Sequence, residues 1–215
     1  MFKVKDFMTK DVICTEKDTT ISEIIDLMNQ NKIHRVPVTE NGKLVGLITE
    51  GMISNSGTSQ ATSLSIYELN YLLSKTTVET VMIKNVVSVD QDELMEYATS
   101  KMLKSDIGCL PVVDQTGDVV GILTQTDVFS CFLNVLGWDE VGARITVSVK
   151  DEVGAIGKLS AIFVEKGINI SHIGVYSLEN GVANLVIRCD TLDPKEICEA
   201  LEEHGYKVLE YFVHK

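Results

Sequence analysis

The chain has 215 residues, of which 45% are hydrophobic and 23% charged, as is typical of soluble globular proteins and not of disordered, collagen-like or disulfide-scaffold chains. A formal net charge of −12 makes the average surface repel phosphate backbones and anionic lipid, which disfavours binding to nucleic acid and to membrane surfaces. The five cysteines are odd in number and include no CxxC pair, so we expect neither a disulfide framework nor a metal site, and a reducing compartment is favoured. The N-terminus lacks the apolar run of a signal peptide and no stretch approaches the ~18 apolar residues of a membrane span, so we expect a cytoplasmic protein.

An internal repeat organises the first two thirds of the chain. The segment VPVTENGKLVGLIT at 36–49 recurs as LPVVDQTGDVVGILT at 110–124, and DFMTKDVICT and TVMIKNVVSV precede the two copies. Each copy is expected to form one supersecondary unit of strand, helix, strand, strand and helix. Neither unit can bury its apolar face alone, so we expect the two copies to pack together.

Local signals place the helices and turns of each copy. In copy one, Thr20 and Glu23 have the spacing of a capping box before an amphipathic helix. Two strands follow, IHRVPV and KLVGLIT, joined by a hairpin turn at the Asn-Gly pair 41–42. In copy two, Asp90 and Glu93 are predicted to cap the corresponding helix.

Outside the repeat, the chain holds a polar connection and a C-terminal third with a different pattern. Residues 54–65 are rich in Ser, Thr and Gly and are predicted to be a mobile insertion, followed by a helical stretch around 66–73. From 144 onward the elements follow the order βαββαβ, with a helix at about 155–166 closed by glycine. This order is that of the ferredoxin-like split βαβ sandwich.

The repeat resembles CBS motifs, whose strand, turn and helix carry the pattern G-apolar-apolar-[ST]-x-x-D, and a pair of which forms a Bateman module. Copy two matches in full, from Gly121 through Thr124 to Asp127. Copy one matches from Gly46 to Thr49 but has Met52 in place of the aspartate. The resemblance therefore implies that one of two related clefts has lost its carboxylate.

The same resemblance implies a site for an adenine nucleotide such as AMP, ADP or ATP, with S-adenosylmethionine as an alternative and no resident cofactor. Each CBS cleft is assembled across a pseudo-two-fold axis, so copy two would face the IHRVP strand of copy one. An ionised carboxylate can accept both hydroxyls of a ribose, and hydroxyl, guanidinium and imidazole groups can donate to phosphate. The implied nucleotide-binding residues are Thr15, Ile33, His34, Arg35, Pro37, Thr124 and Asp127. In the opposite cleft, Gly108 and Cys109 replace the His-Arg pair.

The C-terminal third resembles an ACT domain, with KDEVGAIGKLSAIFVEKGINI in place of the D-x-P-G loop, helix and second strand of that family. Val153 replaces the proline. The resemblance implies a small effector, commonly an amino acid, at a dimer interface, with its carboxylate at the helix start and its ammonium near a carboxylate or amide. The matching positions are Asp151, Gly154, Asn169 and Ile170. An alternative is that the ACT fold serves only for dimerisation.

Each singled-out side chain also has a purely structural interpretation. Asp127 has the position of a helix-start carboxylate that interacts with the helix dipole. The pair formed by His34 and Arg35 has the pattern of a solvated strand edge. Cys109 is expected to be a small buried hydrophobe, because no basic neighbour is evident to form a thiolate, and His172 is expected to be exposed or at an interface.

We therefore expect an α/β (α+β) fold, a CBS-domain pair followed by a ferredoxin-like βαββαβ ACT domain. The expected boundaries are 1–53 for CBS motif 1, 54–77 for the insertion, 78–137 for CBS motif 2 and 138–215 for the ACT domain. This combination is similar to the acetoin-utilisation protein family. It implies a non-catalytic, homodimeric sensor that regulates a partner enzyme. The alternatives are a ligand-free structural subunit and an enzyme of acetoin metabolism, but the chain has no GxSxG, HExxH or Walker A motif, so no catalytic residue is predicted.

Overall fold

The computed structural model describes residues 2–58 and 65–215, with only the backbone of 56–58 and 176–179. It divides into two compact units, an N-terminal unit of Met1–Phe129 and a C-terminal unit of Ser130–Lys215. Residues 59–64, in the middle of the predicted mobile insertion, lie outside the described residues. No helix in the described part of the chain is long and apolar enough to cross a membrane.

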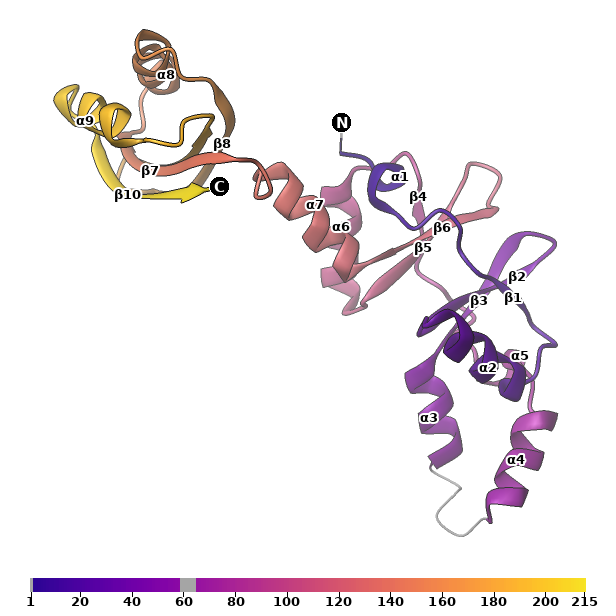
Figure 1. Cartoon of the computed structure of the whole chain (residues 1–215). Coiled ribbons are helices and arrows are strands. Elements are labelled where there is room, and N and C mark those ends of the chain that lie inside the picture. The colour runs from indigo at the N-terminus through magenta and orange to yellow at the C-terminus, as the bar shows by residue number, and fades with distance from the viewer. Residues whose placement is uncertain (1, 59–64) are drawn as a thin grey trace. The chain divides into compact units, whose positions relative to one another are not determined.

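The N-terminal unit contains the two copies of the sequence repeat as two matching three-stranded sheets (Figure 1). In each sheet a short first strand runs parallel to the second, and the second and third strands form an antiparallel hairpin. In chain order, the elements are α1 (Val4–Phe7), β1 (Thr15–Glu16), α2 (Ile21–Asn31), β2 (Arg35–Glu40), β3 (Lys43–Thr49), α3 (Glu50–Thr58), α4 (Ile66–Lys75), α5 (Val78–Val81), β4 (Val89–Asp90), α6 (Met95–Ser105), β5 (Cys109–Val113) and β6 (Val119–Thr124), and α7 (Gln125–Val135) continues into the C-terminal unit.

The capping box and the hairpin turn predicted for copy one are confirmed. Thr20 Oγ1 accepts a hydrogen bond from Glu23 N at 3.3 Å, and the Glu23 carboxylate accepts one from Thr20 N at 2.8 Å, which completes the predicted capping box of α2. Asn41 and Gly42 have φ values of 53° and 82°, as a type I′ hairpin turn requires.

The predicted cap in copy two is wrong. Helix α6 begins after Leu94, which forms no side-chain cap. Asp90 belongs to β4, and its carboxylate accepts a hydrogen bond from Asp92 N at 2.8 Å. Asp90 therefore stabilises the turn before the helix, because local hydrogen bonds of aspartate to the backbone compete with helix capping.

The N-terminal segment packs on copy two and not on the copy that follows it in the chain. Val4 N donates to Glu93 O at 2.9 Å, and Thr9 and Ile122 exchange two backbone hydrogen bonds of 3.0 Å. Val4 is fully buried, so the short helix α1 is part of the packed unit. The segment upstream of copy one thus completes the sheet and core of copy two.

The segment upstream of copy two does the same for copy one. Val78 N donates to Thr19 O at 2.8 Å, and Leu47 and Ile83 exchange backbone hydrogen bonds of 3.0 and 2.9 Å. This reciprocal exchange confirms that the two copies pack together. It also makes them interdependent, since unfolding either copy removes backbone partners from the other.

This exchange of leading segments explains why the repeated G-apolar-apolar-[ST] pattern begins with a glycine. A Cβ atom on Gly121 would lie 2.8 Å from Thr9 O, and one on Gly46 would lie 3.2 Å from Ile83 O. Both positions lie in the third strand of a sheet, where the exchanged segment crosses at close range. A residue without Cβ permits this approach of two backbones.

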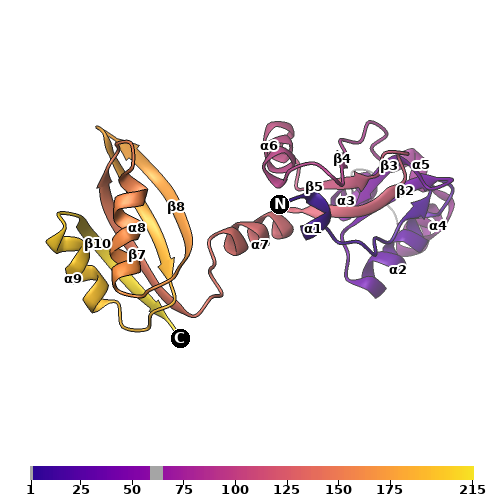
Figure 2. The same cartoon turned by 90° about the horizontal axis from the view of Figure 1, so that it is seen from above.

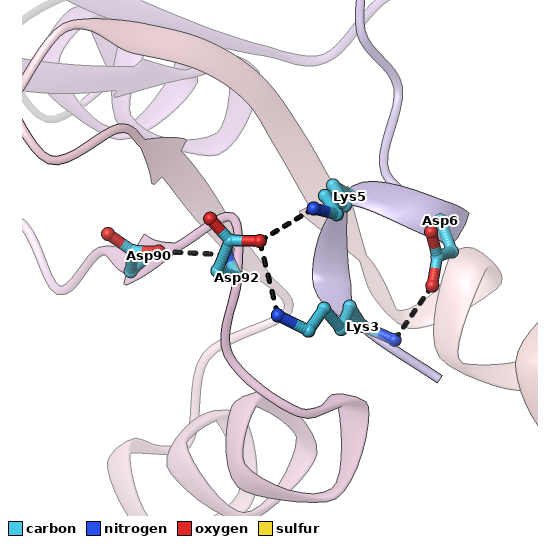
Figure 3. Close-up of polar contacts among 5 residues, drawn as sticks. All are labelled: Lys3, Lys5, Asp6, Asp90 and Asp92. Carbon is cyan, nitrogen blue, oxygen red and sulfur yellow. Dashed lines mark hydrogen bonds and ion pairs between the residues drawn. The ribbon is translucent and has the colours of Figure 1, made fainter. Parts of the chain in front are cut away.

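Ion pairs add to the docking of the N-terminal segment (Figure 3). Lys3 Nζ and Lys5 Nζ both donate to Asp92 Oδ1, at 3.2 and 2.7 Å. These contacts, with Lys5 as the larger contributor, hold the pKa of Asp92 below its usual value. Asp6 closes the first turn of α1 by accepting from Lys3 N at 3.0 Å.

Asp92→Asn is expected to lower the midpoint of thermal unfolding by only about 1–2 °C, because exposed ion pairs contribute little. The carboxylate has a lower pKa in the folded state, so its contribution is present at neutral pH and is lost as the pH falls through that folded value. Calorimetry of both proteins at pH 7 and at pH 3 to 4 would check this. A difference that grows with falling pH would contradict the assigned role.

Apolar side chains from both copies meet in a small shared core. Leu47 of copy one packs with Cys109 and Ile122 of copy two, and all three are buried. The burial of Cys109 in this core agrees with its expected role as a small hydrophobe. Burial raises the pKa of its thiol, although Arg35, a basic neighbour that the sequence did not reveal, acts in the opposite direction. All five cysteines are free thiols.

Helix α3 is longer than the sequence predicts. Residues 54–58 are helical, whereas we expected the insertion to begin at 54. Ile53 is buried in the core of copy one, and extending an anchored helix costs far less than starting one. The predicted helix around 66–73 is confirmed as α4, with a capping box formed by Ser65 and Glu68.

The C-terminal unit is the predicted ferredoxin-like sandwich. Its sheet has the strand order β10-β7-β9-β8 with every pair antiparallel, and both helices cover one face (Figure 2). Its elements are β7 (Gly142–Lys150), α8 (Ala155–Glu165), β8 (Ile170–Glu179), β9 (Val182–Cys189), α9 (Lys195–Glu203) and β10 (Lys207–His214). Gly167 follows α8 with a φ of 65°, as the predicted glycine stop requires.

Alternation along the central strands separates the two faces of this sheet. Ile145 and Ile187 are fully buried on the face that the helices cover, where Phe163 of α8 is 1% exposed. Their strand neighbours Arg144 and Arg188 therefore project to the opposite face. That face is not covered by α8 or α9.

Candidate functional site

Arg35 of copy one reaches into copy two. It begins β2, and its Nη2 atom lies 3.1 Å from where a Cβ atom on Gly108 would stand. Gln125 Oε1 lies 3.5 Å from the same point, and Gln125 N donates to Gly108 O at 3.3 Å. The guanidinium of Arg35 is thus placed beside the first residue of α7, in a space that exists because residue 108 has no side chain.

Asp127 lies in the first turn of that same helix. Its Oδ2 atom accepts from Thr124 N at 2.7 Å and from Thr124 Oγ1 at 2.8 Å. Asp127 therefore holds the helix start, as its structural interpretation suggested. A carboxylate has about four acceptor positions, and the Thr124 contacts occupy two of them, so Oδ1 retains the acceptor capacity for a pair of ligand hydroxyls.

The Thr124 hydroxyl makes a hydrogen bond within the chain. We expected its hydroxyl to donate to a phosphate, but its single proton is donated to Asp127. Thr124 therefore orients the carboxylate in this structure, and its contact with a phosphate stays a prediction.

In copy one, the corresponding helix start has different contacts. Thr49 Oγ1 accepts from Met52 N at 3.3 Å, and Met52 occupies the position that corresponds to Asp127. His34 and Glu50, the counterparts of Gly108 and Gln125, form a contact of 2.7 Å between Nδ1 and Oε2. The related position in copy one is therefore filled by an internal polar pair, whereas in copy two it is open to Arg35.

The remaining predicted nucleotide-binding residues have other neighbours. Ile33 and His34 line a cavity of about 500 Å³ in copy one, to which neither Arg35 nor Asp127 contributes. Thr15 is buried and donates to Thr19 Oγ1 at 2.9 Å. Pro37 is buried within β2. The structure thus places Arg35 beside Gly108 and Gln125, next to the helix start where Thr124 and Asp127 are hydrogen-bonded to each other. It places His34 in the wall of a cavity that Arg35 does not line.

Gln125 is a site residue that the sequence analysis missed. Its counterpart in copy one is Glu50, so the repeat comparison contained the signal. An amide beside Arg35 leaves the positive charge of the guanidinium uncompensated, whereas a carboxylate there would neutralise it. A neutral side chain at 125 therefore favours an anionic ligand.

The predicted effector residues of the C-terminal unit lie on two loops. Asp151 is exposed just after β7, and Gly154 precedes α8 with a φ of 86°, no side-chain cap, and open space where a Cβ atom would stand. Asn169 is exposed and its backbone N donates to Asp190 Oδ1 at 3.0 Å, while Ile170 begins β8 half-buried. The loop before α8 is thus accessible to a ligand.

Comparison with known families agrees with this architecture. A CBS domain model matches residues 4–56 and 78–134. An ACT domain model matches residues 143–206. The chain belongs to the CBS-domain family and carries an ACT domain. Both are regulatory domain types, and the predicted order of a CBS pair followed by ACT is confirmed.

Three solved structures resemble the CBS part of this CBS–ACT chain. The CBS domain pair of protein MJ0100, in complex with 5′-methylthioadenosine and S-adenosyl-L-methionine, is 30% identical with a TM-score of 0.53, covering 65% of this chain and 99% of that one. CBSX2 of Arabidopsis thaliana, in complex with AMP, is 26% identical with a TM-score of 0.54, covering 63% and 99%. A protein described as the acetoin utilization protein AcuB of Vibrio cholerae is 28% identical with a TM-score of 0.54, covering 65% and 96%.

The first curated relatives are much longer proteins that carry enzyme names. They are 32% and 33% identical to this chain over 60% and 58% of its length. The chain spans 23% of the length of each.

Proposed function

We propose that this CBS–ACT chain is a cytoplasmic, homodimeric and non-catalytic sensor that binds an adenine nucleotide between its two CBS copies. The observation that carries the proposal is the reach of Arg35 from copy one to Gly108 and Gln125 of copy two, at the helix start that holds Asp127. The carboxylate would accept the ribose hydroxyls and the guanidinium would receive a phosphate. Similar CBS pairs bound to AMP and to S-adenosyl-L-methionine support an adenosine ligand.

The contributions of Thr15, Ile33, His34 and Pro37 to this site stay predictions. His34 is held by Glu50, and a phosphate would have to compete with that carboxylate for the imidazole. Thr15 and Pro37 are buried, so they would shape the wall of an adenine pocket and not donate to the ligand. Ile33 is half-buried and offers apolar surface.

We further propose an amino acid as the ACT effector, at Asp151, Gly154, Asn169 and Ile170. The accessible, uncapped start of α8 supports this, because free backbone N–H groups and the helix dipole attract a carboxylate. The exposed Asp151 and Asn169 offer acceptors for an ammonium group. Ligands of both domains would act on a regulated partner enzyme by favouring one of two packing states.

A thermal-shift panel on the purified chain tests the proposal. AMP, ADP, ATP, 5′-methylthioadenosine and S-adenosylmethionine, followed by the twenty amino acids, are added at increasing concentration. A ligand that binds only the folded state raises the unfolding midpoint in proportion to the logarithm of its concentration. Stabilisation by at least one adenosine compound is expected. A flat response to every nucleotide would overturn the sensor and favour a ligand-free subunit.

Arg35→Met is expected to weaken AMP binding by about 10-fold while leaving adenosine affinity unchanged, because only the phosphate loses its charged donor. Isothermal calorimetry with both ligands measures the difference. Lys104→Met, which removes an exposed cation from α6, serves as the charge-matched control. Equal losses for AMP and adenosine would show that Arg35 does not contact the phosphate.

A further inference from the structure

The open face of the ACT sheet carries a row of basic side chains. Arg144 and Arg188 are directly opposite each other on β7 and β9, and His172 of β8 is opposite Arg188. Residues paired in this way project from the same face with neighbouring Cβ atoms, so like charges in register repel. Such a row requires compensation from other groups.

The two outer members of the row have carboxylate partners. Arg144 donates to Glu210 Oε1 at 3.0 Å, and Nδ1 of His172 lies 3.3 Å from Glu140 Oε2. The central member does not: the structure records no hydrogen bond or ion pair for the Arg188 guanidinium among the described residues. Arg188 is nevertheless only 5% exposed.

Aromatic stacking partly accounts for the burial of Arg188. Its Cζ atom lies 5.5 Å from the centre of the Trp138 ring. Burial, with a smaller effect from Arg144, lowers the pKa of Arg188, and Glu140 and Asp139 act in the opposite direction. A buried charge without an ionic partner is costly, and cation–π stacking recovers only part of that cost. The position therefore favours an anion.

The guanidinium of Arg188 borders a cavity of suitable size. This cavity, of about 900 Å³, lies within the C-terminal unit, between the open sheet face and the end of α7 with the residues that follow it. Its apolar walls include Phe132, Leu133, Trp138 and Phe212. Its volume is in the range of small-molecule sites, about 300–1,000 Å³.

Charges at the cavity indicate which anion it would accept. Glu210 lines it, and Glu140 and Asp139 act electrostatically on Arg188. These carboxylates oppose nucleotides and other multiply charged anions. One unpaired guanidinium matches a single carboxylate, which it can bind through two parallel hydrogen bonds.

We propose that this cavity binds an organic monocarboxylate with an apolar or aromatic body, with the carboxylate on Arg188 and the body between Trp138 and Phe212. This site is on the sheet face that α8 and α9 leave open, whereas the effector position proposed above is at the loop before α8. It uses residues of the C-terminal unit alone. It therefore does not depend on nucleotide binding by the CBS pair.

Trp138 provides the test, because it is the only tryptophan of the chain and lines the cavity. The full-length protein is titrated with phenylacetate, 3-phenylpropionate and 4-methylpentanoate, and with the corresponding neutral amides, while tryptophan fluorescence is recorded. At least one acid is expected to give a saturable change, with an affinity at least about 10-fold higher than that of its amide. The comparison of acid with amide needs no mutation, so it tests the proposal even if a variant fails to fold.

Arg188→Met is expected to weaken binding of the responding acid by at least about 10-fold, while Lys207→Met, which removes an exposed cation of the same sheet, leaves it unchanged. No saturable response to any acid, equal responses to acid and amide, or unchanged binding in folded Arg188→Met would each overturn the proposal. If no acid gives a response, sedimentation at the same protein concentration tests whether the chain self-associates. Self-association would identify a second copy of the chain, and not a carboxylate, as the occupant of the cavity.

Discussion

Asp127→Ala is expected to weaken adenosine-nucleotide binding by at least about 100-fold, because two ligand hydroxyls would lose a charged acceptor and each such hydrogen bond contributes about 1.5–3 kcal/mol. The same change removes the acceptor of Thr124 N at the start of α7, which is expected to cost about 1 kcal/mol of stability. Calorimetric titration with the nucleotide selected by the thermal-shift panel measures the first effect. Chemical denaturation measures the second.

Two further variants separate the ligand contact from the structural role of Asp127. Met52→Ala changes the equivalent helix position in copy one, where no carboxylate exists, and is expected to leave nucleotide affinity unchanged. Asp127→Asn keeps the size and one acceptor oxygen but removes the charge, so it should bind the nucleotide with an affinity between those of wild type and Asp127→Ala. Wild-type affinity in a folded Asp127→Ala protein would assign Asp127 to the helix start alone.

Phe163→Ala is expected to destabilise the C-terminal unit by about 3–5 kcal/mol, because truncating a buried aromatic ring loses transfer free energy and leaves a cavity. Phe163 is 1% exposed at the centre of the core between α8, α9 and the sheet. Since the chain has two compact units, denaturation is expected to show two transitions, of which only the one belonging to the C-terminal unit moves.

Val164→Ala is the matched control for this prediction. Val164 is the next residue of α8 and is 75% exposed, so its truncation should change stability by no more than about 0.5 kcal/mol. Fluorescence of Trp138, which belongs to the C-terminal unit, assigns the transition. Equal effects of the two substitutions would contradict the core position of Phe163.

The sequence alone determined the features that arise from neighbours along the chain. The capping box of Thr20 and Glu23 and the Asn41-Gly42 turn depend on a few consecutive residues, and both are present as predicted. The repeated segments and the βαββαβ order depend on periodicity within each element, and they suffice for the CBS and ACT folds. The helical extent of 54–58 was missed because Ser and Gly are weak helix formers, and an anchored helix overrides that preference.

The tertiary structure alone decided which residues meet across long separations. The exchange of leading segments pairs Thr9 with Ile122, and nothing in the local pattern of either segment specifies that partner. Arg35 reaches Gly108 only because the two copies pack together. The same packing gives Arg35 a neighbour in copy two, whereas His34 contacts Glu50 within copy one. Arg188 resembles any strand arginine in the sequence. Only its register with Arg144, its burial and the stacking of Trp138 show that it is buried with no ionic partner in the described part of the chain. The physical reason is that capping, turns and periodicity are short-range properties of the chain, whereas burial and charge compensation are set by segments that come together only when the chain folds.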